Sequence, residues 1–477
     1  MKTIRGFAAA ARLLTRPRRS GDGYETPPAL RRRIKETFGE DLSAEQLVER
    51  IVTDVRERGD VALREYTLRL DKVELDCLEV SEREWKAACN KVNRSVLRAL
   101  EMAAERIRRF YEMSREHGPS EFSHAGLGQM VQPLERVGLY APGGTASYPS
   151  TVLMTAVPAK VAGVGEIVLT TPPRSDGSIP TATLAAARLA GVARVFKLGG
   201  AQAIAALAYG TETVPRVDKI CGPGNIFVVL AKKQVFGQVA IDGLHGPSEV
   251  VIIADGTAEP ALCAAEMVAQ AEHDTMASAI LVTPSARLAQ KVEQAVERQL
   301  EKSSRLPSGR RDIIAQSLEE NGRIVLVDDV AEAVELAALY APEHLCLMVR
   351  RAEEWALKVR NAGAVFVGKW SPVAMGDYVA GPSHVLPTGG TARFSSPLGV
   401  SDFLRVSHVV ALDARQFKAL GPVARTLAEA EGLEAHGQAV AMRLSNLSLR
   451  GGRRRRTPKQ SGAPGRIASA PSRGASQ

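Results

Sequence analysis

The chain has 477 residues, of which 45% are apolar and 24% charged, as in ordinary globular proteins of two or more domains. A membrane-spanning helix needs about 18 consecutive apolar residues. The most apolar stretch, residues 151–171, is broken by Pro158, Lys160 and Glu166. The composition therefore argues against a membrane partner and favours a cytoplasmic protein.

The formal net charge of +9 is concentrated at the two ends of the chain. Residues 1–20 carry six lysines and arginines, residues 450–477 carry eight, and neither segment has an acidic residue. This leaves 48 of the 62 basic residues for the body of the chain, against 53 acidic ones. We therefore do not expect nucleic acid as a partner in the main function.

Both basic ends are predicted to be disordered. Residues 450–477 lack the apolar content needed to offset the entropy of ordering. Residues 1–20 fit an unstructured extension, and an organellar transit peptide is the alternative interpretation. The five cysteines show no spacing typical of zinc or redox motifs, which favours free thiols in a reducing compartment.

The central region shows alternating helix and strand patterns. Residues 44–116 have apolar positions at helical spacing, so we predict helices there. Beyond Gly118, short β-rich runs alternate with alanine-rich helical stretches, which is typical of βαβ units and a parallel sheet. The β-rich runs are residues 166–171, 194–198, 249–254, 278–282 and 323–327.

Two such blocks can be distinguished, from Tyr140 to about His245 and from Gly246 to about Gly368. They predict an α/β protein with two Rossmann-like parallel sheets. No GxGxxG motif follows the first strand of the first block, so the pattern by itself assigns no dinucleotide site there.

The first candidate for chemistry is a pair of polar residues near the end of a predicted helix at 260–273. Gln270 and His273 are three residues apart, which places them on one helical face where they could present two metal ligands. A polar helix terminus before a turn at Asp274 is the alternative.

The second candidate is the pair Glu343 and His344, between a predicted helix at 330–339 and an apolar run at 345–349. A neighbouring carboxylate and imidazole can carry out acid–base chemistry near neutral pH. A surface glutamate beside a partly buried histidine is the alternative.

Two further segments add polar residues. The Gly- and Pro-rich segment 371–388 contains Asp377 and His384, and Glu431 and His436 follow in the segment 431–440. A glutamine, a histidine, an aspartate and a second histidine would form a mixed nitrogen and oxygen site that suits zinc.

Seven strings, in order over residues 30–449, together resemble the histidinol dehydrogenase family. They are YAPGGTASYPSTVLM, GGAQAIAALAYGTETVPRVDKICGPGN, GPSEVVIIAD, AQAEHD, YAPEHL, GDYVAGPSHVLPTGGTARFSSPLGVSDF and AEGLEAHGQAV.

The resemblance implies a zinc ion, NAD as cofactor and L-histidinol as substrate. The implied zinc ligands are Gln270, His273, Asp377 and His436. Ser248, His344 and Glu431 would join these four around the substrate. Tyr140, Gln202 and Asn225 would contact NAD.

The resemblance also implies an intertwined homodimer with helical N-terminal and C-terminal extensions, in which the segment bearing Glu431 and His436 completes the partner's site. The expected parts are a disordered extension at 1–20, a helical part and the start of the first domain at 21–139, an NAD-contacting domain at 140–247, a catalytic domain at 248–398, a C-terminal segment at 399–449 and a disordered tail at 450–477.

Four positions differ from the family pattern without removing a matched ligand. His245 stands where a small residue is usual, Cys221 replaces an aliphatic residue, Val373 replaces a glutamate and Ser383 replaces an asparagine. They affect the expected shape of the pocket rather than the reaction.

Oxidation of an alcohol to a carboxylate removes two hydrides, so it requires two NAD molecules, a base and a way to hydrate the aldehyde. We expect His344 to be the base and Glu343 to activate water. A cysteine adduct is the alternative route for the aldehyde. The rival functions are a zinc-dependent dehydrogenase for another small polar alcohol and a protein that binds anionic partners through its basic tail.

Overall fold

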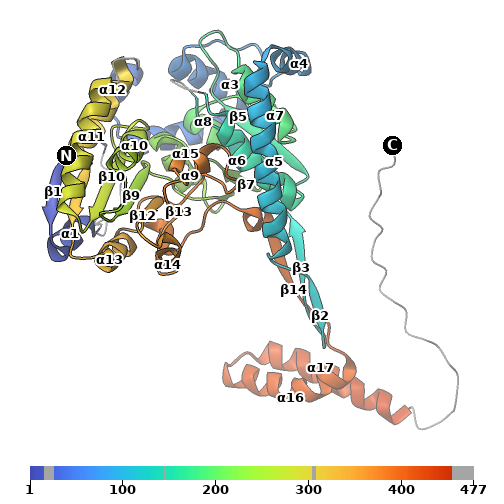
Figure 1. Ribbon diagram of the computed structural model, residues 1–477. Helices are drawn as coiled ribbons and strands as arrows, with labels where there is room; N and C mark the ends of the chain where they lie inside the picture. The colour runs from blue at the N-terminus through green and yellow to red at the C-terminus, as the bar shows by residue number, and fades with distance from the viewer. Residues whose placement is uncertain (16–25, 144–146, 303–307, 454–477) are drawn as a thin grey trace. The chain divides into compact units, whose positions relative to one another are not determined.

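The computed structural model describes residues 1–15, 26–143, 147–302 and 308–453. The chain divides into two compact units, Met1–Pro119 with Gln132–Arg405, and Ser120–Val131 with Val406–Gln477. The first unit contains two all-parallel sheets, each covered by helices on both faces (Figure 1). The predicted α/β class with two Rossmann-like sheets is confirmed.

The five-stranded sheet has the order β6-β5-β4-β7-β8. The order reverses direction between β4 and β7, and such a switch point opens a crevice beyond the carboxyl ends of the two strands. The strands are β4 (Arg136–Tyr140), β5 (Glu166–Thr171), β6 (Arg194–Lys197), β7 (Lys219–Cys221) and β8 (Ala240–Ile241).

Alternating side chains of these strands pack into two cores, one on each face. Ile167 and Leu169 of β5 belong to one core and Val168 to the other. The first core is formed with α4 (Glu82–Lys91), α5 (Arg94–Glu116), α6 (Pro149–Ala162) and α7 (Thr181–Leu189). The second is formed with α2 (Pro28–Phe38), α3 (Ala44–Asp71), α8 (Gly200–Tyr209) and α9 (Ile226–Val235).

The six-stranded sheet has the order β1-β11-β10-β9-β12-β13, and its direction reverses between β9 and β12. Every residue of β9 is buried, as expected for a central strand covered on both faces. The strands are β1 (Lys2–Arg5), β9 (Glu249–Ala254), β10 (Ser278–Thr283), β11 (Arg323–Leu326), β12 (His344–Met348) and β13 (Ala364–Val367).

Helices cover this sheet on both faces as well. One core includes residues of α10 (Pro260–Ala271), α11 (Ala286–Lys302) and α12 (Ser308–Glu320). The opposite core includes residues of α1 (Phe7–Leu14), α13 (Val330–Tyr340) and α14 (Ala352–Ala356). The short α15 (Val373–Tyr378) follows β13, and the 3-10 turns Thr391–Arg393 and Val400–Phe403 come after it.

The prediction of disorder at residues 1–20 is wrong for the described residues 1–15. β1 pairs in parallel with β11, and Ile4, Ala10 and Leu14 are buried in the core of the six-stranded sheet. The prediction was based on the charge of the arginines. The apolar residues between them form a strand and a helix instead. Residues 16–20 lie outside the described residues.

The second unit is built from a sheet and a helical hairpin. The sheet has the order β14-β3-β2, formed by β2 (Phe122–His124), β3 (Leu127–Pro133) and β14 (Leu404–Val410). The hairpin consists of α16 (Ala414–Ala430) and α17 (Glu434–Arg453). Residues 450–453, which were expected to belong to a disordered tail, continue α17, and the rest of that prediction lies outside the described residues.

Candidate active site

Tyr140 marks the crevice of the five-stranded sheet, because it is the last residue of β4, at the switch point. Its hydroxyl accepts a hydrogen bond of 3.1 Å from the N–H of Gly200, the first residue of α8. Burial raises the pKa of Tyr140 to about 12, so the phenol stays neutral and acts only through hydrogen bonds.

The other two residues predicted to contact NAD lie at the starts of helices. Gln202 is buried in the first turn of α8, and its Oε1 has no hydrogen-bond partner within the described residues. Asn225 caps α9 by accepting from the N–H groups of Phe227 and Val228, at 3.1 and 3.3 Å. Tyr140 and Gln202 therefore meet at one helix start, and Asn225 lies at the start of the next helix.

Gly222 follows β7 and faces the same crevice. Its φ of +120° favours glycine, and a Cβ atom there would collide with the carbonyl oxygen of Tyr140. Its N–H donates to Asp242 Oδ2 over 2.6 Å and its carbonyl accepts from Lys232 Nζ over 2.6 Å. The turn is thus held by a buried ion pair, in which Lys232 Nζ lies 2.6 Å from Asp242 Oδ1.

Glu343 and His344 lie at the opposite type of edge, the amino ends of β12 and β9. The Glu343 carboxylate accepts a hydrogen bond of 2.9 Å from the N–H of Glu249, the first residue of β9. Nδ1 of His344 lies 3.1 Å from the carbonyl oxygen of the same Glu249. A carbonyl can only accept, so Nδ1 carries the proton and Nε2 of the neutral ring is left with its lone pair.

His344 is therefore oriented as a base. Its Nε2 is buried without a hydrogen-bond partner in the described part of the chain and lies 3.9 Å from Asp377 Oδ1. Burial, with further contributions from His273 and His384, lowers the pKa of His344 to about 3. The ring is consequently neutral at physiological pH.

The pKa values of two carboxyl groups in the site are raised, whereas that of His344 is lowered. Burial raises the pKa of Glu343 well above its usual range, an effect partly offset by the Glu249 N–H and the Ser248 hydroxyl. Burial and the nearby Glu266 raise the pKa of Asp377 to about 7. Strongly shifted pKa values of this kind are common at functional sites.

Three of the four predicted metal ligands come from two neighbouring helical segments. Gln270 is buried in the last turn of α10, His273 lies two residues beyond its end, and Asp377 belongs to α15. The expected helix over 260–273 thus ends at Ala271, and the His273 N–H returns to the Gln270 carbonyl over 3.3 Å. His273 keeps an exposed surface, and desolvation by the groups packed around its imidazole lowers its pKa.

His384 lies beside Asp377 and forms hydrogen bonds through both of its ring nitrogens. Its Nδ1 donates to the Asp377 carbonyl over 2.9 Å, and its Nε2 accepts from the Thr151 hydroxyl over 3.1 Å. Both ring nitrogens are therefore committed to protein groups. His384 orients the loop rather than offering a ligand.

The remaining predicted residues, Glu431 and His436, belong to the second unit. Glu431 directly follows the last residue of α16, His436 lies in the first turn of α17, and both are exposed. Their part in the site stays a prediction, and no group of three or more His, Cys, Asp or Glu residues with metal-binding geometry occurs in the described ranges.

The chain matches the model of the histidinol dehydrogenase family over residues 35–444. The chain belongs to the histidinol dehydrogenase family. The family expected from the seven strings is therefore confirmed.

Relatives match over nearly the whole chain. A histidinol dehydrogenase of Dehalococcoides mccartyi (strain CBDB1) is 50% identical over 444 residues, covering 93% of this chain and 100% of the relative. One from Deinococcus radiodurans is 51% identical over 447 residues, with the same coverages. The crystal structure of histidinol dehydrogenase from Elizabethkingia anophelis is 35% identical, with a TM-score of 0.83, and covers 94% of this chain and 99% of that one.

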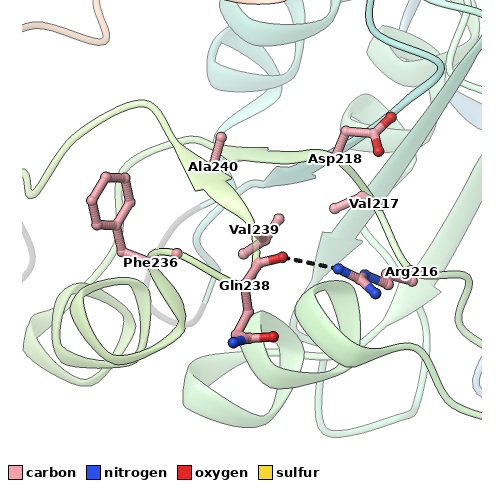
Figure 2. A pocket seen from close by; sticks show the side chains of 8 residues that line it. Arg216, Val217, Asp218, Phe236, Gln238, Val239 and Ala240 are labelled. Atoms are coloured by element: carbon pink, nitrogen blue, oxygen red, sulfur yellow. Dashed lines mark hydrogen bonds between the residues drawn. The ribbon is translucent and has the colours of Figure 1, made fainter. Parts of the chain in front are cut away.

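A cavity of about 300 Å³ lies away from these residues, at the amino ends of β7 and β8 (Figure 2). The Arg216 guanidinium donates to the Gln238 carbonyl across it, over 3.0 Å. None of the predicted site residues of the family lines this cavity, so it gives no information about the reaction. Its lining consists of Arg216, Val217, Asp218, Phe236, Gly237, Gln238, Val239 and Ala240.

Sequence reasoning missed Glu266, a buried carboxylate one turn before Gln270 on α10. The spacing of four residues between the two was the available signal.

No helix in the described ranges is long and apolar enough to cross a membrane.

Proposed function

We propose that the chain oxidises L-histidinol through L-histidinal to L-histidine with two molecules of NAD, the last steps of histidine biosynthesis. The observation that carries the proposal is the state of His344. Its ring is neutral, its Nδ1–H is fixed by the Glu249 carbonyl, and its Nε2 has a free lone pair among the proposed substrate-binding groups.

The first step needs a base at the alcohol oxygen. His344 Nε2 takes the hydroxyl proton while the carbon that bears the oxygen gives a hydride to NAD, leaving the aldehyde and NADH. The hydrogen bond to Glu249 keeps the lone pair directed into the site throughout.

The second step begins with hydration. The ionised Glu343 carboxylate removes a proton from water as the water oxygen adds to the aldehyde carbon. The aldehyde oxygen takes up the proton that His344 received in the first step, so the hydrate forms and His344 is again a free base. Burial raises the pKa of Glu343, which makes its ionised carboxylate a stronger base. The hydrate then loses a proton to His344 and a hydride to a second NAD, which yields the carboxylic acid.

We propose Gln270, His273 and Asp377, with His436, as zinc ligands. The donor set of an amide oxygen, two imidazoles and a carboxylate suits zinc, and Gln270 has a buried side-chain amide nitrogen without a hydrogen-bond partner in the described part of the chain. The oxygen and nitrogen of a glutamine side chain exchange places when the amide is turned by half a rotation. The oxygen of Gln270 can therefore take the position without a partner and face a metal ion. When bound, zinc would hold the substrate's nitrogen atoms and orient its alcohol carbon.

The substrate contacts are proposed to come from the ligand residues together with Ser248, His344 and Glu431. Ser248 directly precedes β9. Its side chain lowers the pKa of Glu343 through a hydrogen bond, so Ser248 lies beside the proposed catalytic pair. For NAD, the crevice residues Tyr140, Gln202 and Asn225 remain the proposed contacts.

A homodimer is also proposed, with a second copy covering an apolar stripe on α16. Leu420, Val423 and Leu427 lie at helical spacing and are 52%, 58% and 59% exposed. The expected partner is the same chain, because the segment bearing Glu431 and His436 follows directly and would complete the partner's site. A cytoplasmic location stays a prediction.

A cysteine adduct is a poor alternative to water. Burial raises the pKa of the Cys346 thiol well above its usual range, and burial likewise raises that of Cys221. A buried thiol that keeps its proton is a weak nucleophile.

The direct test measures NADH formation by the purified protein from L-histidinol, with and without a chelator. We expect two NADH per histidinol and loss of activity after zinc removal, restored by added zinc. Other small polar amino alcohols are compared in parallel. Faster turnover of one of them would instead support the rival substrate.

A further inference from the structure

The buried side chain of Glu266 joins the two helical segments that carry proposed metal ligands. Its Oε2 accepts a hydrogen bond of 3.0 Å from the N–H of Val373. Glu266 lies four residues before Gln270 on α10, and Val373 lies four residues before Asp377 on α15. One hydrogen bond thus connects the helices one turn from a proposed ligand on each side.

The helix that carries Asp377 depends on such contacts. α15 has only six residues, too few to be stable by itself, and Pro372 before it provides no side-chain cap. His384 holds the far end of α15 through the Asp377 carbonyl. Glu266 holds the near end, so the two contacts together fix the direction of the helix.

Burying the Glu266 carboxylate costs free energy, because the group loses its hydration. A contact that served only packing would not require a carboxylate. The residue is 8% exposed, and burial raises its pKa with no cation among the causes. An apolar side chain would fill the same space without desolvating a carboxylate. The distinctive contribution of Glu266 is an acceptor at the distance of the Val373 N–H.

We propose that Glu266 is a positioning residue for the metal site and sets the spacing between Gln270 and Asp377. This inference rests on the proposed zinc site and adds a determinant of its affinity. Glu266 acts through its hydrogen bond to Val373, so an uncharged acceptor of the same shape should replace it.

Four variants separate the acceptor from the charge and from the donor. Glu266→Gln keeps an acceptor oxygen, whereas Glu266→Ala removes it. Val373→Pro removes only the donor, since proline is well tolerated at the first position of a helix and Pro372 already has the extended conformation required before it. Val373→Ala keeps the N–H and controls for the smaller side chain.

The measurements are zinc affinity, by competition with a chromogenic chelator, and the visible spectrum of the cobalt(II)-substituted protein, which reports ligand geometry. We expect Glu266→Ala and Val373→Pro to weaken zinc binding about 10- to 100-fold, the usual scale for residues that orient metal ligands. Glu266→Gln and Val373→Ala should stay close to the wild type in affinity and spectrum. The double variant Glu266→Ala/Val373→Pro should bind zinc as well as either single variant.

Thermal unfolding of the zinc-free proteins controls for misfolding, and Gln270→Ala tests the zinc site itself. If Gln270→Ala weakened zinc binding while Val373→Pro matched Val373→Ala, the role of Glu266 would be wrong and the site would stand. Equal losses in Glu266→Gln and Glu266→Ala would also overturn it. Unchanged affinity in Gln270→Ala would refute the zinc site instead.

Discussion

The two parallel sheets of the first unit share one architecture, yet their proposed site residues lie on opposite edges. In the five-stranded sheet, Tyr140 and the turn at Gly222 lie at the carboxyl ends of β4 and β7. In the six-stranded sheet, Glu343 and His344 lie at the amino ends of β9 and β12. The difference determines which backbone groups face the ligand.

At the carboxyl edge, strands lead into turns and helix starts. α8 and α9 both begin there, and the N–H groups of a helix start favour negatively charged groups such as a pyrophosphate. Gly222 allows the turn to approach the Tyr140 carbonyl closely. We propose that this edge binds the dinucleotide.

At the amino edge, one strand residue organises both proposed catalytic groups. The N–H of Glu249 holds the Glu343 carboxylate, and its carbonyl fixes the proton of His344 on Nδ1. The backbone of β9 thus sets the orientation of one group and the tautomer of the other. We infer that cofactor binding and proton transfer are divided between the two kinds of edge.

The largest expected effect is on the amino edge. His344→Asn should lower the rates of oxidation of histidinol and of supplied histidinal by about 10²- to 10⁴-fold, because both hydride transfers use the same base. Zinc content and the KM for NAD should change little. A variant that kept the rate of either step would break the proposed division of roles.

Removal of the buried ion pair at the carboxyl edge should instead lower the stability of the protein and weaken cofactor binding. Lys232→Met leaves Asp242 buried without its cation and should lower the free energy of unfolding by about 3–5 kcal/mol. The KM for NAD should rise, since Lys232 also holds the Gly222 carbonyl.

The neighbouring Lys233 provides the matched control. Its ion pair with Glu45 is at 3.4 Å and its side chain is 56% exposed, so Lys233→Met should cost less than about 1 kcal/mol. Urea titrations of the two variants decide the matter. Equal costs would mean that burial of the pair is unimportant.

A smaller effect concerns Asp71, which ends α3. Burial raises its pKa to about 6, and its Oδ2 has no hydrogen-bond partner within the described residues. The folded state therefore binds the proton more tightly than the unfolded state, and ionisation of Asp71 lowers stability as the pH rises from about 4 to 6.

Asp71→Asn should accordingly stabilise the protein by on the order of 1–3 kcal/mol at pH 8, with a smaller gain at pH 4.5. Chemical denaturation at the two pH values measures this difference. The exposed Asp76 serves as the control, because Asp76→Asn should follow the wild-type curve at both. A gain independent of pH would contradict the assignment.

The smallest effect is expected from the tail. Deletion of residues 454–477, which leaves α17 complete, should leave turnover and the KM for NAD nearly unchanged, because their composition cannot form a packed core. A large loss of activity in a correctly folded truncation would give the tail a role in the site or in assembly.

The sequence predicted those parts of the fold that depend on local patterns. The apolar runs 166–171 and 249–254 were expected as strands and are β5 and β9. β1 was missed because its burial depends on pairing with β11, more than 300 residues away.

For the proposed site, the sequence supplied a set of candidate residues and not their arrangement. The pairing of β12 with β9 places His344 beside Glu249, and no local pattern specifies that pairing. The tautomer of His344 follows from it. The role inferred for Glu266 likewise depends on a contact with a residue 107 positions later.

The most direct test of the proposed amino-edge chemistry is single-turnover NADH formation by Glu343→Gln from histidinol and from supplied histidinal, after equal zinc content has been established. If Glu343 activates water, the variant should form the first NADH from histidinol at nearly the wild-type rate and oxidise histidinal about 10²-fold or more slowly. Equal slowing of both steps would contradict this role and would leave Glu343 as a group that only orients its neighbours.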